Sequence, residues 1–171
     1  MPVLPAVFAC AYTATPDTLE STYFSPMARF ELSLPTCDLF FTELTIRIRD
    51  INYGGHLSND ALLALLHEAR LQWLKQLGFA DELDVGGKGL IMTDVAICFR
   101  QEVFHGQSLQ IALGCAEVGR ASFDLYYDVT QEGRPIAQAR TGMAAFDYQR
   151  RKISSLPTPL RTALEPRGIT P

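Results

Sequence analysis

The residues best suited to chemistry gather in one short stretch, Arg49–Asn59, whose sequence is Arg-Asp-Ile-Asn-Tyr-Gly-Gly-His-Leu-Ser-Asn. A glycine pair, a histidine and a Ser-Asn pair here separate a strand-like run from a helix-like run. Free backbone N–H groups at the start of a helix carry partial positive charge, so they can polarise a carbonyl group or hold an anion. The sequence therefore predicts a site at this helix start.

Two polar residues in the first half of the stretch are candidates for acid–base chemistry. Asp50 and Asn52 are two residues apart, and in an extended chain such residues point to the same face. Asp50 could then act as a base while Asn52 orients a water molecule or contacts the substrate. The alternative for Asp50 is a structural role at a strand end or in an Asx turn.

The second half of the stretch supplies candidates for substrate binding. Gly54 and Gly55 allow positive φ and close approach of the backbone to a ligand, although a plain turn explains them equally well. His56 could donate a hydrogen bond to a bound group or fix the loop. For Asn59 the relevant group is the backbone N–H, which we expect to act as an oxyanion hole.

Composition excludes several classes of protein. A chain of 171 residues with 47% hydrophobic and 20% charged residues is typical of one soluble globular domain. The net charge of -4 does not indicate a basic surface of the kind that binds nucleic acid. The only dense basic cluster, residues 150–152, is too short to change this conclusion, although it could meet the phosphates of a ligand.

Cysteine and histidine usage argues against a metal site and against disulfides. The four cysteines are Cys10, Cys37, Cys98 and Cys115, and no two of them form a Cys-x-x-Cys pair. The three histidines are dispersed too, so neither a zinc site nor a disulfide framework is predicted. No apolar run reaches the roughly 18–20 residues needed to span a bilayer, and the N-terminal residues lack the basic region of a secretory signal. We therefore expect a cytoplasmic protein without membrane insertion.

Hydrophobic periodicity predicts one strand and one long helix around the candidate site. Residues 41–49 alternate apolar and polar side chains, which is typical of a half-buried strand. From Asn59 to Leu77, apolar residues recur every three or four positions and predict an amphipathic helix of about five turns. Ser58 or Asn59 is its expected N-cap, and Gly78 its stop.

The rest of the chain predicts strands. Residues 90–104, 108–118, 121–131 and 135–148 are separated by short Gly-containing breaks, which favours an antiparallel meander of hairpins. The first strand should lie apart from its sequence neighbour because the helix intervenes. This order predicts an α+β fold in which a curved antiparallel sheet wraps a long central helix.

Three regions are expected along the chain. Residues 1–35 contain several prolines and no sustained period, and we interpret them as an N-terminal extension that we expect to be partly disordered. Residues 36–155 form the folded domain. Residues 156–171, again rich in proline, are expected to be a C-terminal tail outside the fold.

With these elements, the chain resembles the hotdog-fold acyl-CoA thioesterases of the 4-hydroxybenzoyl-CoA thioesterase type. The resemblance rests on Gly55-His56-Leu57-Ser58-Asn59, on Glu68-Ala69-Arg70 at the expected later spacing, and on residues 99–109, which match the family's second strand and turn. It covers residues 39–148. It implies a hotdog fold, hydrolysis of an acyl-CoA thioester to free acid and coenzyme A, and no metal or redox cofactor. It also implies a homodimer or homotetramer with active sites between subunits.

One departure from the family pattern concerns the reaction itself. By spacing from Gly55-His56, the family's usual catalytic aspartate falls on Asn52. An asparagine carries no charge and cannot be a general base or a carboxylate nucleophile. The carboxylate must then come from another residue, or the protein does not use the family's Asp route.

Glu68 is the leading replacement for this carboxylate. It follows Asn59 by nine residues, about 13–14 Å along a helix at 1.5 Å per residue, so it would serve a partner's site rather than its own. The alternative is an i, i+3 or i+4 surface pair with an Arg or Lys neighbour on the helix. A rival function is a non-catalytic acyl-CoA or acyl-carrier binding protein that keeps the pocket without the aspartate. A hotdog dehydratase is weaker, because its expected motifs are missing.

Overall fold

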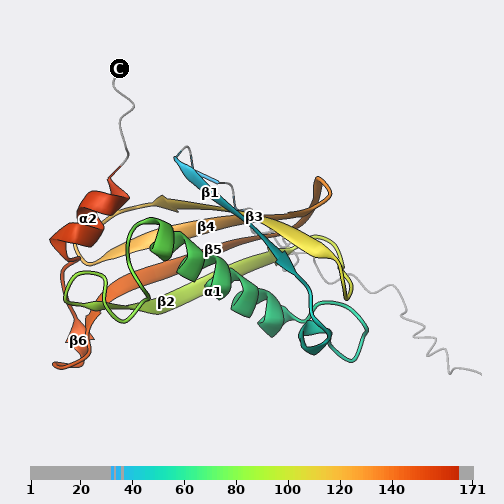
Figure 1. Cartoon of the computed structure of the whole chain (residues 1–171), viewed down its shortest axis with the longest axis horizontal. Coiled ribbons are helices and arrows are strands. Elements are labelled where there is room, and N and C mark those ends of the chain that lie inside the picture. The colour runs from blue at the N-terminus through green and yellow to red at the C-terminus, as the bar shows by residue number, and fades with distance from the viewer. Residues whose placement is uncertain (1–31, 33, 36, 166–171) are drawn as a thin grey trace, which may run out of the picture.

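The computed structural model describes residues 32, 34–35 and 37–165, so nearly all of the expected N-terminal extension lies outside the described residues. Two helices, a short 3₁₀ helix and six strands follow one another along the described chain (Figure 1). In order they are β1 (Leu39–Thr45), η1 (Ile48–Asp50), α1 (Asn59–Gln76), β2 (Gly89–Phe99), β3 (Ser108–Ala116), β4 (Ser122–Gln131), β5 (Arg134–Asp147), β6 (Lys152–Ile153) and α2 (Thr158–Leu164).

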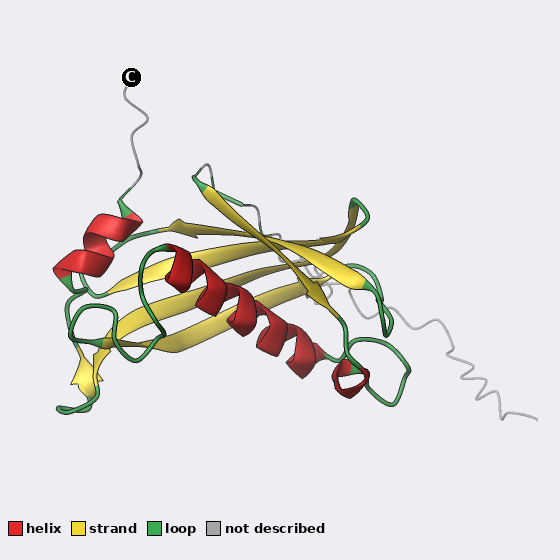
Figure 2. Cartoon of the chain, in the orientation of Figure 1, coloured by secondary structure: helices red, strands yellow, loops and turns green. Residues whose placement is uncertain are grey.

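The strands form one antiparallel sheet, and α1, which is 18 residues long, lies across one of its faces (Figure 2). The strand order is β1-β3-β4-β5-β2, with the short β6 paired to the end of β5. As expected, β1 lies far from β2, at the opposite edge of the sheet.

The expected four-stranded meander is only partly correct. Strands β3, β4 and β5 are joined by hairpins, but β2 pairs with β5 and not with β3. The turn at residues 104–107 is bonded to the end of β1 instead, since Ile46 N–H donates to Gln107 O at 2.9 Å and Gly106 N–H donates to Ile46 O at 3.0 Å. The segment after β2 therefore crosses the sheet from one edge to the other.

The core lies between α1 and the sheet. Alternate residues of β4, from Phe123 to Val129, are fully buried, as a strand with one face against a helix requires. Trp73 of α1 packs on Phe123 with ring centroids 6.3 Å apart. Most of the apolar stripe that predicted α1 is therefore buried against the strands.

Both ends of α1 follow the sequence signals. Ser58 is the N-cap, and its hydroxyl oxygen accepts a hydrogen bond from Ala61 N–H at 3.2 Å. At the other end Gly78 has φ +95°, the left-handed conformation in which glycine commonly ends a helix.

The chain departs from the expected strand after Thr45. Residues 48–50 form η1, and Ile48 is 72% exposed although the alternating pattern placed it in the core. The cause is local, because the Asp50 carboxylate accepts a hydrogen bond from Arg47 N–H at 2.8 Å and closes a turn. The predicted strand over 41–49 is therefore four residues too long at its C-terminal end.

The C-terminal segment differs from expectation as well. Residues 158–164 form α2, and Leu156, Leu160 and Leu164 are buried in the core. The expected tail from residue 156 therefore begins as part of the fold. Within the described residues, no helix is long and apolar enough to cross a membrane.

Candidate active site

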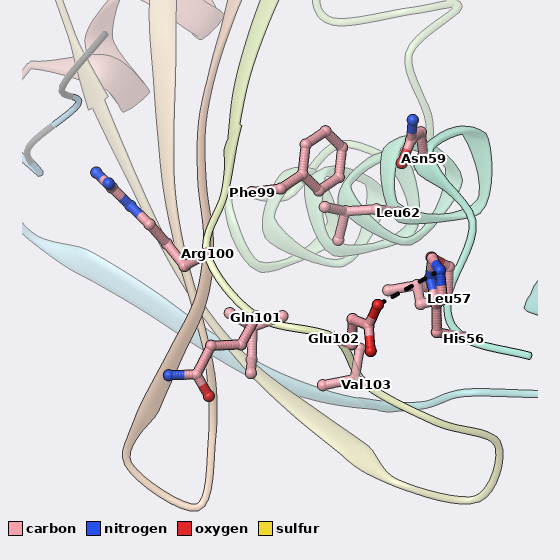
Figure 3. A pocket seen from close by; sticks show the side chains of 10 residues that line it. His56, Leu57, Asn59, Leu62, Phe99, Arg100, Gln101, Glu102 and Val103 are labelled. Atoms are coloured by element: carbon pink, nitrogen blue, oxygen red, sulfur yellow. Dashed lines mark hydrogen bonds and ion pairs between the residues drawn. The ribbon is translucent and has the colours of Figure 1, made fainter. Parts of the chain in front are cut away.

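A cavity of about 210 Å³ opens between the start of α1 and the end of β2 (Figure 3). Its apolar lining comes from Leu57, Leu62, Phe99, Val103 and Ile136. Its polar lining comes from His56, Asn59, Arg100, Gln101 and Glu102. The combination of an apolar floor and a few polar groups is typical of a small-molecule site. Of the residues singled out in the sequence, His56 and Asn59 line the cavity directly.

The loop before α1 is closed by its own hydrogen bonds. Asn52 N–H donates to His56 O at 2.9 Å, and Gly55 N–H donates to Asn52 O at 3.0 Å. The Asn52 side-chain oxygen accepts from Gly54 N–H at 2.8 Å, which makes an Asx turn. Gly55 has φ +82°, a conformation that favours glycine. Asn52 and Gly55 therefore shape the loop that presents His56.

His56 is held at the mouth of the cavity. Its Nδ1 lies 3.2 Å from Leu57 O and 3.4 Å from the side-chain nitrogen of Asn52. Its Nε2 faces the carboxylate of Glu102, with Oε1 at 3.7 Å, as the dashed line in Figure 3 marks. Both ring nitrogens are thus adjacent to polar groups, and the Nε2 edge is the one turned toward the cavity.

Asp50 is occupied by structural contacts. Its side chain is buried, with Oδ2 bonded to Arg47 N–H and Oδ1 3.7 Å from Arg49 Nε. Its carbonyl oxygen accepts from Ser58 N–H at 2.9 Å. A 3₁₀ helix ends at Asp50, so the Asp50 carboxylate faces the backbone of Arg47, while the Asn52 side chain closes its own turn onto Gly54 N–H.

Glu68 lies on the exposed face of α1 and does not line the cavity. Its carboxylate accepts a hydrogen bond from Gln72 at 2.9 Å, and Gln72 in turn accepts one from Thr42 of β1 at 2.5 Å. Glu68 therefore has an i, i+4 partner on the helix surface, but that partner is the amide of Gln72 and not the Arg or Lys side chain considered in the sequence.

The start of α1 carries the expected polar groups. Asn59 is the first helical residue, so its N–H has no acceptor within the helix. In the same turn, a hydrogen bond from the Ser58 side chain holds the pKa of the Asp60 carboxyl below its usual value. Nowhere in the described part of the chain do three or more His, Cys, Asp or Glu side chains gather in a way that could hold a metal ion.

Comparison with known proteins identifies the family. The model of the thioesterase-like superfamily matches residues 46–164, which include α1, the cavity and α2. The chain belongs to this superfamily. The resemblance found in the sequence is thereby confirmed at the level of the superfamily.

The relatives agree with this assignment. A 1,4-dihydroxy-2-naphthoyl-CoA hydrolase from Synechococcus elongatus is 26% identical over 123 residues, which cover 70% of this chain and 90% of the relative. A 1,4-dihydroxy-2-naphthoyl-CoA thioesterase from Synechocystis superimposes with a TM-score of 0.67 at 24% identity, covering 74% of this chain and 96% of the other. A gentisyl-coenzyme A thioesterase superimposes with a TM-score of 0.67 at 19% identity, covering 73% and 99%. The fold is that of the hotdog-type thioesterases.

The lining of the cavity also contains a carboxylate that the sequence did not point to. Among the described residues, Glu102 is the only Asp or Glu that lines the cavity. Sequence reasoning did not single it out, because it lies 46 residues after His56 and no local pattern joins the two. The only available signal was its place in the segment 99–109, which resembles the family's second strand and turn.

Proposed function

We propose that this protein hydrolyses an acyl-CoA thioester to a free carboxylic acid and coenzyme A. The observation that carries the proposal is the cavity itself, which begins at the first residue of α1 in a thioesterase-like chain. Its apolar floor suits an acyl group, and His56 and Asn59 lie at its polar side. The carriers named for the relatives are coenzyme A thioesters, which favours the same carrier here.

In this reaction a water oxygen attacks the thioester carbon and negative charge develops on the carbonyl oxygen. The N–H of Asn59, at the positive end of the helix dipole, stabilises that charge. Collapse of the tetrahedral intermediate breaks the C–S bond and releases the thiol. His56 contacts the reacting groups from the loop that Asn52 and Gly55 shape.

We also propose a homo-oligomer, a dimer or a tetramer. Strand β2 is at the end of the strand order, so one of its edges has no neighbour in the sheet. Three apolar side chains of this strand are 40–51% exposed: Met92, Val95 and Phe99. Each of them is paired in the sheet with a residue of β5 that is buried. A second copy that pairs along β2 would cover these apolar side chains.

Three expectations from the sequence remain proposals of the same kind. We propose that the sheet wraps around α1, because the buried side chains of α1 face the strands. We propose that residues 36–155 carry the site. We also propose a cytoplasmic location, in keeping with the acyl-CoA substrate.

A thiol-release assay tests the function. Purified protein is given short, medium, long and aromatic acyl-CoAs, and the free thiol is followed with a disulfide reagent. We expect turnover on at least one substrate class. Binding of acyl-CoA without turnover on any of them would instead support the non-catalytic acyl-CoA or acyl-carrier binding protein.

The glycine pair gives a matched test of His56. A Cβ on Gly54 would lie 3.0 Å from His56 Nε2 and 3.1 Å from Asn52 Oδ1, so Gly54→Ala must displace the ring. We expect it to lower kcat/KM about tenfold, since small misplacements of catalytic groups cost up to about a hundredfold. In Gly55→Ala, by contrast, the new Cβ meets nothing within 4 Å, but φ is +82°.

Gly55→Ala should therefore lower stability by about 1–2 kcal/mol from backbone strain. Thermal unfolding and steady-state kinetics of the two variants separate the effects. Full activity in a folded Gly54→Ala protein would contradict the expectation that the reaction depends on the position of the His56 ring.

A further inference from the structure

We propose that Glu102 is the general base of this site and that it activates a water molecule held between its carboxylate and His56. The proposal rests on the proposed thioester hydrolysis and names the residue that performs its proton transfer. It replaces Asp50 and Glu68 in that role.

The geometry of the pair is the first support. Glu102 Oε1 and His56 Nε2 are 3.7 Å apart, which is longer than a direct hydrogen bond. Two polar atoms at such a separation can share one bridging water. Both side chains line the cavity, and in Figure 3 a dashed line joins them. A water bonded to both atoms would therefore lie at the wall of the cavity.

The second support is how the backbone holds Glu102 in place. Leu57 N–H donates to Val103 O at 2.9 Å, which fastens the segment after β2 to the loop that carries His56. On the other side, Arg100 N–H donates to Ile136 O at 2.8 Å. Glu102 is thus positioned by hydrogen bonds on both sides of it, although its own side chain is 66% exposed.

The charges around Glu102 leave its carboxylate available. Arg100 is the cation closest to it in sequence, but its guanidinium donates to Gln138 at 3.2 Å and is directed away from His56 in Figure 3. Among the described residues, the ion pair with His56 is the only one found for Glu102. The Asp50 carboxylate, in contrast, accepts a hydrogen bond from Arg47 N–H, and the Glu68 carboxylate accepts one from Gln72 outside the cavity.

The chemistry balances without a cofactor. The Glu102 carboxylate takes a proton from the water as the water oxygen forms a bond to the thioester carbon, and the carbonyl oxygen becomes an oxyanion at Asn59 N–H. When the C–S bond breaks, the sulfur leaves as a thiolate and receives the proton that Glu102 holds. The products are one acid and one thiol, and the carboxylate is regenerated for the next turnover.

The test uses the full-length protein and Glu102→Gln, which keeps the shape of the side chain and removes its charge. We expect kcat to fall about a hundred- to ten-thousandfold, the range for loss of a general base. Binding of a non-hydrolysable thioether analogue of the substrate, measured by calorimetry, should change less than about threefold. In Glu102→Ala, added formate should restore part of the turnover, which a purely structural role would not allow.

Glu68→Gln and Asp50→Asn are the matched controls, since each removes one other candidate carboxylate. The assignment to Glu102 is overturned if Glu102→Gln keeps wild-type turnover or if Glu68→Gln alone abolishes it; the second result would place the base on the helix of a second copy. Failure of the proposed function has a different signature, because the wild-type protein itself would then turn over no acyl-CoA.

Discussion

Replacing Asn59 with proline is expected to lower kcat by about a hundred- to a thousandfold while α1 stays folded. Asn59 is the first helical residue, where proline is well tolerated because its missing N–H has no partner within the helix. The preceding residue, Ser58, already has φ -78° and ψ 155°, the extended conformation that a following proline requires. The substitution therefore deletes one backbone donor together with the Asn59 side chain and leaves the helix start otherwise unchanged.

Asn59→Ala is the matched control for this prediction. It removes the side chain and keeps the backbone N–H, so we expect turnover within a few-fold of the wild type. Circular dichroism and thermal unfolding of both variants show whether α1 is intact. Equal activity in the proline and alanine variants would mean that the oxyanion is not stabilised by this N–H.

The parts of the site that the sequence predicted are those determined by local interactions. The N-cap at Ser58, the positive φ of Gly55 and the end of α1 at Gly78 each depend on a few neighbouring residues. The strand before Asp50 was predicted too long for a local reason as well. The Asp50 carboxylate can close a turn onto Arg47 N–H, and that interaction overrides the alternation that predicted a longer strand.

Glu102 could not be predicted from its neighbours, because a long-range contact brings it to the site. The bond from Leu57 N–H to Val103 O joins segments that are 46 residues apart. The hairpin expected between β2 and β3 is absent for a similar reason. The partner of β2 is β5, which comes later in the chain, and the segment between β2 and β3 crosses to the other edge of the sheet. Strand order depends on such pairings and not on the length of the intervening turn.

The C-terminal helix shows how proline can mislead a reading of the sequence. Leu156, Leu160 and Leu164 are spaced at four residues, which is a helical period, yet the prolines at 157 and 159 indicated a tail. In the structure Pro157 is the N-cap and Pro159 lies in the first turn of α2, where a missing N–H costs nothing. The prolines therefore mark the start of a helix and not the end of the fold.

The largest effect on stability is expected at the ion pair that joins α1 to the start of β2. Arg70 of α1 is only 4% exposed, and its Nε donates to Glu82, whose second carboxylate oxygen lies 2.9 Å from His67. The Glu82 carbonyl oxygen also accepts from Leu90 N–H at 2.7 Å, at the start of β2. We expect Glu82→Ala to lower the free energy of unfolding by about 3–5 kcal/mol, because it leaves the Arg70 cation buried without its counter-ion.

Among the described residues, Glu82 is the one carboxylate that forms an ion pair with Arg70. Burial raises the pKa of the Tyr127 phenol beside Arg70, so that tyrosine stays neutral. Arg70 Nη1 is buried and has no hydrogen-bond partner within the described part of the chain. Replacing both charges at once should therefore cost less than removing one of them. We expect the double variant Arg70→Met, Glu82→Ala to recover most of the loss in urea unfolding at neutral pH. A double variant as unstable as Glu82→Ala alone would show that the lost stability comes from the hydrogen bonds between Glu82 and its loop. The buried, unpaired charge of Arg70 would then not be the cause.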